Sequence, residues 1–288
     1  MSAWKYAIAA ATAPDGSIFV IGGAGTNGVT TTVEVLSPHG NKWSVGPSLP
    51  SPRYRLAAAT GGDGRVYAIG GSDAGYLGIF ASVFALTPGA SQWVEVAPMP
   101  TPRQLPAATT GIDGLIYVAG GSNVLNSTVN ILNALEIYNP ATGRWTTGAP
   151  MPTPRYDPAM ATAPDGRIYV IGGFGDAIYN ISNVVEVYSP VTRAWTTAAP
   201  IPEPRRGLAD AVTGSDGLIY LIGGCEVVIK PSGWDCANTR RVDVYSPDTN
   251  TWQSVEPTLE DHREGAAVIS GKRIYAIGGH TTAVESAK

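Results

Sequence analysis

The chain has 288 residues and a formal net charge of −4 at pH 7. It contains 35 glycines, 23 prolines and 8% aromatic residues, which is typical of a turn-rich, all-β chain. The mild negative charge and the absence of a basic run argue against nucleic acid or an anionic lipid surface as a partner. No stretch of 18 apolar residues occurs, so we expect no membrane insertion.

The first unit of the chain shows a pattern that then repeats. It opens with Trp4-Lys5, followed by a stretch of small residues, the turn Asp15-Gly16 and an apolar run that ends in Gly22-Gly23. After a loop, Glu34 lies in an alternating strand, and Trp43 begins a polar strand. The pattern predicts four strands in this unit.

Five further units follow in the same order. Each contains a Gly-Gly pair at the end of an apolar strand, and successive pairs lie 48 to 55 residues apart: 22–23, 70–71, 120–121, 172–173, 223–224 and 278–279. A period near 50 is the size of a four-stranded propeller blade. We therefore predict one domain over residues 1–288, a β-propeller of six blades.

Each element of the repeat has a physical reason. The first strand is rich in alanine, as in Ala57-Ala58-Ala59, because the inner strands of a propeller converge on its axis. Asp-Gly pairs such as 63–64 provide the positive φ of a tight hairpin. The second strand is apolar throughout, as expected between neighbouring blades, and the polar fourth strand suits an exposed edge.

The sixth unit is incomplete. Nine residues follow Gly278-Gly279, which is enough to begin a third strand, but they contain no tryptophan for a fourth. Two alternatives remain: the last blade is one strand short, or the native protein continues.

The repeat resembles the kelch family over nearly the whole chain. The marks are the Gly-Gly pair, the tyrosine before it (Tyr67, Tyr117, Tyr169, Tyr220 and Tyr275), the tyrosine of the third strand (Tyr138, Tyr188 and Tyr245) and the tryptophan of the fourth. Six such units in register identify the chain as similar to a kelch-type β-propeller. The resemblance implies a site on the loops at one mouth of the ring.

A basic residue opens each unit, and we interpret it as part of the scaffold. The set is Lys5, Arg53, Arg103, Arg155 and Arg205, with Arg263 after His262 in the sixth unit. Acids recur in the third strand as Glu34, Glu136, Glu186 and Asp243, whereas Phe84 takes this place in the second unit. We expect ion pairs between the two sets in most blades, but not in the second.

The resemblance also implies which residues bind a ligand. In kelch propellers that bind peptides, contacts come from residues just after the repeat arginine and just after Gly-Gly. These positions vary between units, which a site requires, and aromatic residues and arginine dominate binding hot spots. The candidates are Tyr6, Tyr54, Arg55, Gln104, Tyr156, Asp157, Phe174, Arg206, Glu264 and His280.

The two cysteines, Cys225 and Cys236, both lie in the loop after the fifth Gly-Gly pair. Their position favours a disulfide, which would place the protein outside the cell or on its surface. Two free thiols in a cytosolic protein are the alternative. Their spacing and the three histidines match no metal motif, and kelch-type copper oxidases need more ligands than this chain offers, so we expect no metal or cofactor.

The expected function is therefore that of a binding module for a protein segment or a glycan. The alternative is a carbohydrate-active enzyme of the kelch superfamily, of the epimerase, oxidase or lyase type, with its site at the same mouth. A buried ionisable pair with shifted pKa values in a deep pocket would favour the enzyme, and a broad aromatic surface would favour the binding module.

Overall fold

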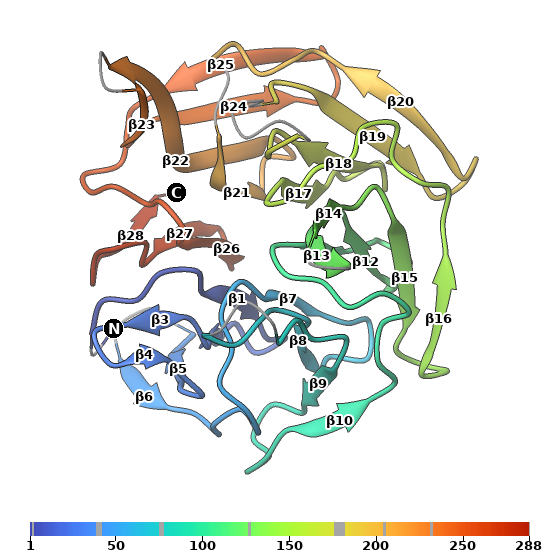
Figure 1. Ribbon diagram of the computed structural model, residues 1–288, viewed down its shortest axis with the longest axis vertical. Coiled ribbons are helices and arrows are strands. Elements are labelled where there is room, and N and C mark those ends of the chain that lie inside the picture. Colours follow the sequence, from blue (N-terminus) through green and yellow to red (C-terminus); the bar gives the residue numbers. More distant parts are fainter. Residues whose placement is uncertain are drawn as a thin grey trace.

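The computed structural model describes residues 1, 3–38, 42–74, 78–125, 128–175, 182–203, 206–230 and 233–287. Six antiparallel sheets stand around a central channel, and the first and last blades lie side by side (Figure 1). Every regular element in the described residues is a strand. Within them, no helix is long and apolar enough to cross a membrane. The all-β, six-bladed prediction is confirmed.

The inner strands line the channel and carry small side chains. Ala9 and Ala57 are both 6% exposed, and each begins the inner strand of its blade. Threonines at the ends of these strands join neighbouring blades: the Thr60 hydroxyl donates to the Thr12 carbonyl oxygen over 2.8 Å, and Thr110 donates to Thr60 over 2.7 Å. The inner strands are β1 (Ala9–Thr12), β7 (Ala57–Thr60), β11 (Ala107–Thr110), β17 (Ala159–Thr162), β21 (Arg206–Thr213) and β26 (Ala266–Ser270).

The second strands form the core between blades. β2, β8, β12 and β18 are buried at every position, because neighbouring blades cover both faces. The Asp-Gly turns before them adopt the expected positive φ, for example 78° at Gly64. The second strands are β2 (Ile18–Ile21), β8 (Val66–Ile69), β12 (Ile116–Ala119), β18 (Ile168–Ile171), β22 (Ile219–Lys230) and β27 (Arg273–Ile277).

The Gly-Gly pairs allow the chain to pass close to its neighbours. Gly71 has a φ of 91°, and a Cβ atom added there would lie 2.7 Å from the carbonyl oxygen of Tyr54. Only glycine fits this combination of backbone conformation and close approach. The loops that follow carry the short strands β3 (Ala24–Gly25), β4 (Gly28–Val29), β13 (Ser122–Leu125), β14 (Thr128–Ile131) and β23 (Gly233–Asn238).

The third and fourth strands complete the blades. The third strands are β5 (Val33–Leu36), β9 (Val83–Leu86), β15 (Leu135–Asn139), β19 (Val185–Ser189), β24 (Val242–Ser246) and β28 (Val284–Ala287). The fourth strands are β6 (Trp43–Val45), β10 (Val94–Val96), β16 (Arg144–Thr147), β20 (Ala194–Ala198) and β25 (Thr251–Val255). In the described residues the sixth sheet has three strands, β26-β27-β28.

The ring closes by packing between the sixth and first blades. Ile8 and Val20 of the first blade share an apolar cluster with Ala266 and Ile277 of the sixth. The Ser270 hydroxyl also donates to the Gly16 carbonyl oxygen over 2.7 Å. Closure therefore rests on the inner and second strands.

The repeat arginines are part of this scaffold, as expected. Arg103 pairs with Glu136, and Arg155 with Glu186, at 2.8 Å in both cases, and both guanidinium groups are fully buried. Arg155 also donates to the carbonyl oxygens of Gly172 and Val184. The Arg205 pair that we expected lies outside the described residues.

In the first and second blades the basic residue or the acid of the Arg–Glu pair is replaced, and other side chains contact the basic residue. In the first blade Lys5 pairs with Glu34 at 2.8 Å. In the second, where Phe84 replaces the acid, the Arg53 guanidinium lies 4.5 Å from the centre of the Phe84 ring. A cation over an aromatic face is a favourable arrangement.

In the sixth blade the sequence interpretation was one residue out of register. His262, and not Arg263, occupies the position of the repeat arginine. Its Nδ1 lies 3.0 Å from the Gly278 carbonyl oxygen, and its Nε2 lies 3.0 Å from Glu285 of β28. Arg263 instead contacts the side chain of Asn238. The sixth blade therefore has a His–Glu version of the scaffold pair.

Candidate functional site

The two sets of predicted binding residues lie beside each other at one mouth of the channel. Single antiparallel bridges join a residue that follows the repeat basic residue to a residue that follows Gly-Gly in the same blade. These pairs are Tyr6 with Ala24, Tyr54 with Ser72, Gln104 with Ser122, and Tyr156 with Phe174. The local pairing explains why positions about 18 residues apart in sequence form one surface.

In every unit except the fifth, the next residue is turned toward the channel by an unusual backbone conformation. Ala7, Arg55, Leu105, Asp157 and Glu264 all have φ between 52° and 58°. Non-glycine residues rarely adopt this left-handed conformation, which persists only where surrounding contacts enforce it. The backbone strain marks this ring as a built feature of the mouth.

Hydrogen bonds between blades enforce that conformation. The amide of Arg55 donates to the carbonyl oxygen of Ala7 over 2.9 Å, and the amide of Leu105 donates to that of Arg55 over 2.8 Å. Asp157 donates to Leu105, and Ala7 to Glu264, each over 2.8 Å. The chain of bonds fixes the side chains that surround the opening.

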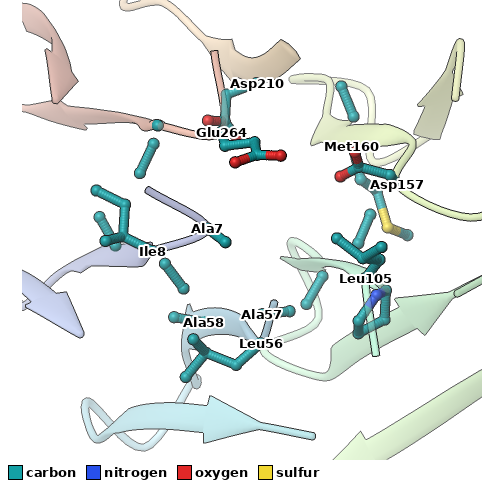
Figure 2. Close-up of a pocket in the computed structure, with 18 of the residues that line it drawn as sticks. Ala7, Ile8, Leu56, Ala57, Ala58, Leu105, Asp157, Met160, Asp210 and Glu264 are labelled. Carbon is teal, nitrogen blue, oxygen red and sulfur yellow. The ribbon is translucent and has the colours of Figure 1, made fainter. Parts of the chain in front are cut away.

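These side chains and the inner strands enclose a cavity of about 130 Å³. Asp157, Asp210 and Glu264 bring three carboxyl groups to one side of it (Figure 2). They come from the fourth, fifth and sixth blades, which are neighbours. Arg55 of the second blade also lines the cavity, and the remaining walls are mainly alanine, leucine and proline.

Asp210 is the functional candidate that the sequence interpretation missed. It lies in the inner strand β21, at the position that Ala57 and Ala107 occupy in β7 and β11. Burial raises the pKa of Asp210 to about 8, and the neighbouring charge of Asp157 adds to the increase. The exchange of alanine for a carboxylic acid in a strand that lines the axis was the signal that could have revealed it.

Aromatic rings stack along the rim above the junction of the sixth and first blades. The rings of Tyr6 and His280 are 4.7 Å apart and nearly parallel, and Trp4 stacks at 6.1 Å from each. His280 Nε2 lies 3.3 Å from Glu264 Oε2. Tyr6, Glu264 and His280 therefore form one connected cluster.

A second aromatic pair lies on the fourth blade. Tyr156 and Phe174 stack with their ring centres 4.7 Å apart and an angle of 4° between the planes. Both are half-buried. Tyr156 precedes Asp157, so this pair adjoins the acidic side of the cavity.

The candidates from the second and third blades form a supporting network. Tyr54 is only 4% exposed and packs against Ala7 and Ala24, so it contributes to the core beneath the rim. The Arg55 guanidinium lies 4.8 Å from the Tyr54 ring centre and donates to the side chain of Gln104. Gln104 is also buried and accepts a bond from Ser72.

Two further predictions involve the fifth blade. The backbone of Arg206 pairs with Cys225, which places Arg206 at the mouth, but its side chain lies outside the described part of the chain. Cys225 is fully buried. In the β22–β23 hairpin Val227 is opposite Cys236, so Cys225 and Cys236 lie diagonally on one face of the hairpin. The side chain of Cys236 lies outside the described residues, and the disulfide stays a prediction.

The described residues contain no group of three or more histidine, cysteine, aspartate or glutamate side chains arranged to hold a metal ion. Among the described side chains, the mouth offers carboxyl groups, the Arg55 guanidinium and aromatic faces to a ligand.

Comparisons with known proteins show which family has this architecture. The family described as the KLHDC2/KLHL20/DRC7 Kelch-repeats domain matches residues 98–279, and the Kelch motif matches residues 9–50 and 53–100. The chain belongs to the kelch-repeat family. The kelch propeller fold suggests an interaction or binding module.

Individual relatives match shorter segments of this chain than the family models do. Kelch-like protein 28 of Mus musculus is 35% identical over 66 residues, which is 23% of this chain and 11% of that protein. The human protein of the same name is 33% identical over 65 residues, again 23% of this chain and 11% of that protein. The match thus covers about a tenth of these relatives. A solved structure titled "Structure of YjhT" superposes with a TM-score of 0.80 at 16% identity, covering 98% of this chain and 94% of that one, which shows the shared fold.

Proposed function

We propose that the mouth of the propeller binds a protein segment that places a cationic side chain in the acidic cavity. The observation that carries this proposal is the arrangement of Asp157, Asp210 and Glu264 around one small opening. Three carboxyl groups from adjacent blades favour a positive charge between them, and low local dielectric strengthens that attraction.

The size of the cavity supports a side chain as the group that enters. Pockets that hold whole small ligands usually have about 300–1,000 Å³, whereas the cavity at this mouth has about 130 Å³ and adjoins a cavity of about 300 Å³ between the inner strands. A lysine or arginine head group is of suitable size. The rest of the ligand would then lie across the rim, where Tyr156 and Phe174 on one side and Trp4 and Tyr6 on the other offer aromatic faces.

A peptide-array screen, followed by fluorescence anisotropy on the best peptides, tests the proposal. We expect the bound peptides to need one lysine or arginine, and its acetylation or replacement by glutamine to abolish binding. Asp157→Asn should weaken binding at least tenfold. The matched control is Glu95→Gln on the exposed outer strand β10, which should bind as the wild type does. Peptides without a cationic residue that bind equally well would contradict the proposal.

A proton-transfer enzyme is the second candidate function, because one observation favours it. Asp210 holds its proton near neutral pH beside Asp157, and pairs of carboxyl groups whose pKa values differ are typical of acid–base catalysis. In this case Asp210 would act as a general acid toward a substrate at the mouth. A glycan array and an activity screen on glycosides distinguish this candidate: turnover that Asp210→Asn abolishes would favour the enzyme over the binding module.

A further inference from the structure

Arg55 is the one basic side chain among the described residues that line the acidic cavity. It comes from the second blade, whereas Asp157, Asp210 and Glu264 come from the fourth, fifth and sixth. In a ring of six blades the second stands opposite the fifth, so Arg55 and Asp210 lie on opposite sides of the opening (Figure 1). The cavity therefore has a possible counter-ion for its carboxyl groups in its own wall.

Two neighbouring side chains hold the Arg55 guanidinium on its own side of the cavity. Its Cζ atom lies 4.8 Å from the centre of the Tyr54 ring, and Nη1 donates to Gln104 Oε1 over 3.3 Å. Tyr54 is 4% exposed and Gln104 is 8% exposed, so packing fixes both contacts. The Ser72 hydroxyl donates to the same Gln104 oxygen over 3.0 Å. The guanidinium is thus attached to the wall that the second and third blades form.

The backbone of Arg55 directs the residue toward the same opening as the acids. Its φ of 56° is the left-handed conformation that Asp157 and Glu264 also adopt at this place in their blades. An arginine side chain is long and has many rotamers, and opposite charges attract strongly where the local dielectric is low. Without its two restraints the guanidinium should therefore move toward the carboxyl groups.

The protonation of Asp210 agrees with a guanidinium that is held away from it. Burial raises the pKa of Asp210 to about 8, and the charge of Asp157 adds to the increase. The other charged side chains that line the cavity are Arg55 and Glu264, and His280 contacts Glu264. A guanidinium in contact with Asp210 would favour the carboxylate and lower this pKa.

We propose that Gln104 is a positioning residue, which holds Arg55 away from the three carboxyl groups and so keeps the cavity open to a cationic ligand. When Arg55 is released, its guanidinium pairs with the carboxyl groups and occupies the place of the ligand. Arg55 is then a competitor that the chain itself supplies. The ligand in this scheme rests on the proposed function, whereas the position of Arg55 can be measured without a ligand.

Binding of n-butylammonium, which copies a lysine side chain, tests the competition by NMR titration. Gln104→Leu keeps the approximate volume but removes the acceptor oxygen, so it should weaken binding by about threefold or more. Arg55→Ala should strengthen binding by about threefold or more, because the competing cation is gone. The double variant should bind as Arg55→Ala does, since Gln104 then has no guanidinium to hold. Gln104→Glu retains an acceptor oxygen and should bind at least as tightly as the wild type.

NMR of the aspartate carboxyl carbons, recorded against pH, reports the position of Arg55 without a ligand. The Asp210 resonance is identified by its loss in Asp210→Asn. Gln104→Leu should lower the pKa of Asp210 because Arg55 approaches it, and the double variant with Arg55→Ala should not. The matched controls Arg144→Ala and Gln253→Ala change exposed residues of the outer strands β16 and β25, and should alter neither measurement. Thermal melts confirm that each variant is folded.

An unchanged pKa of Asp210 in Gln104→Leu would overturn the proposal, whatever the binding data show. Weaker binding of n-butylammonium to Arg55→Ala than to the wild type would also overturn it, because Arg55 would then assist the ligand. If the pKa falls in Gln104→Leu but n-butylammonium does not bind the wild type, Gln104 positions Arg55 as proposed, and the result counts against the proposed function alone.

Discussion

The buried ion pair between Arg155 and Glu186 gives the sharpest prediction about the scaffold. The side chains are 0% and 1% exposed, and Thr153 also donates to the Glu186 carboxylate over 2.7 Å. Glu186→Gln keeps the volume but removes the charge, so the Arg155 guanidinium stays buried without a counter-ion. Breaking a buried pair in this way costs about 3–5 kcal/mol of unfolding free energy.

The exposed pair Arg167–Asp165 is the matched control. Arg167 Nε lies 2.6 Å from Asp165 Oδ2, but the two side chains are 41% and 44% exposed. Asp165→Asn should therefore lower the free energy of unfolding by less than about 1 kcal/mol. The second blade provides another comparison, since Phe84 takes the place of the third-strand acid there: Arg53 lies over its ring, and the acid near Arg53 is Glu95 of the fourth strand. Glu186→Phe copies that arrangement and should recover part of the loss.

Urea denaturation followed by circular dichroism measures all three variants. We expect the order of stability to be wild type, then Asp165→Asn, then Glu186→Phe, then Glu186→Gln. If Glu186→Gln costs no more than Asp165→Asn, the repeat arginines do not stabilise the blades through these acids, and their assignment to the scaffold is wrong.

Three further predictions concern the mouth and the fifth blade. The folded-state pKa of Asp210, about 8, is above that of an unfolded aspartate, so Asp210→Asn should raise the melting temperature at pH 8. It should leave the melting temperature nearly unchanged at about pH 3, where the carboxyl group is largely protonated in both states, and an equal effect at both pH values would refute this. If Cys225 and Cys236 pair, peptide mapping under non-reducing conditions should recover both cysteines in one disulfide-linked fragment. Reduction should then lower the free energy of unfolding by about 2–3 kcal/mol. Alkylation of both thiols without prior reduction would exclude the bond. Tyr54→Ala should lower the free energy of unfolding by about 3–5 kcal/mol, because the Tyr54 side chain is buried. Tyr156→Ala should lower it clearly less. Equal decreases in the melting temperatures of the two variants would contradict this difference.

Much of the architecture could be predicted from the sequence because the repeat carries it. The Gly-Gly pairs fall where the chain needs positive φ and close approach, as at Gly71. Asp-Gly pairs mark the hairpins, and the apolar runs are the buried second strands. The Arg103–Glu136 pair was also predictable, because both residues recur at fixed places in the unit.

Features that depend on a single blade were harder to predict. Histidine can replace the repeat arginine only because Glu285 and the Gly278 carbonyl lie on opposite sides of its ring, a geometry that the sequence does not display. The burial of Tyr54 depends on Ala7 and Ala24 of the neighbouring blade. Asp210 was missed because its significance arises where three blades meet around the axis.

The measurement that tests the central claim most directly is calorimetry of a lysine-containing peptide at pH 7, in buffers with different ionisation enthalpies. Asp210 is largely protonated at this pH, and a cation in the cavity favours its charged form. We predict release of up to one proton on binding to the wild type and no release with Asp210→Asn. Binding without proton release in the wild type, or with equal release in both proteins, would show that the cationic group does not enter the acidic cavity.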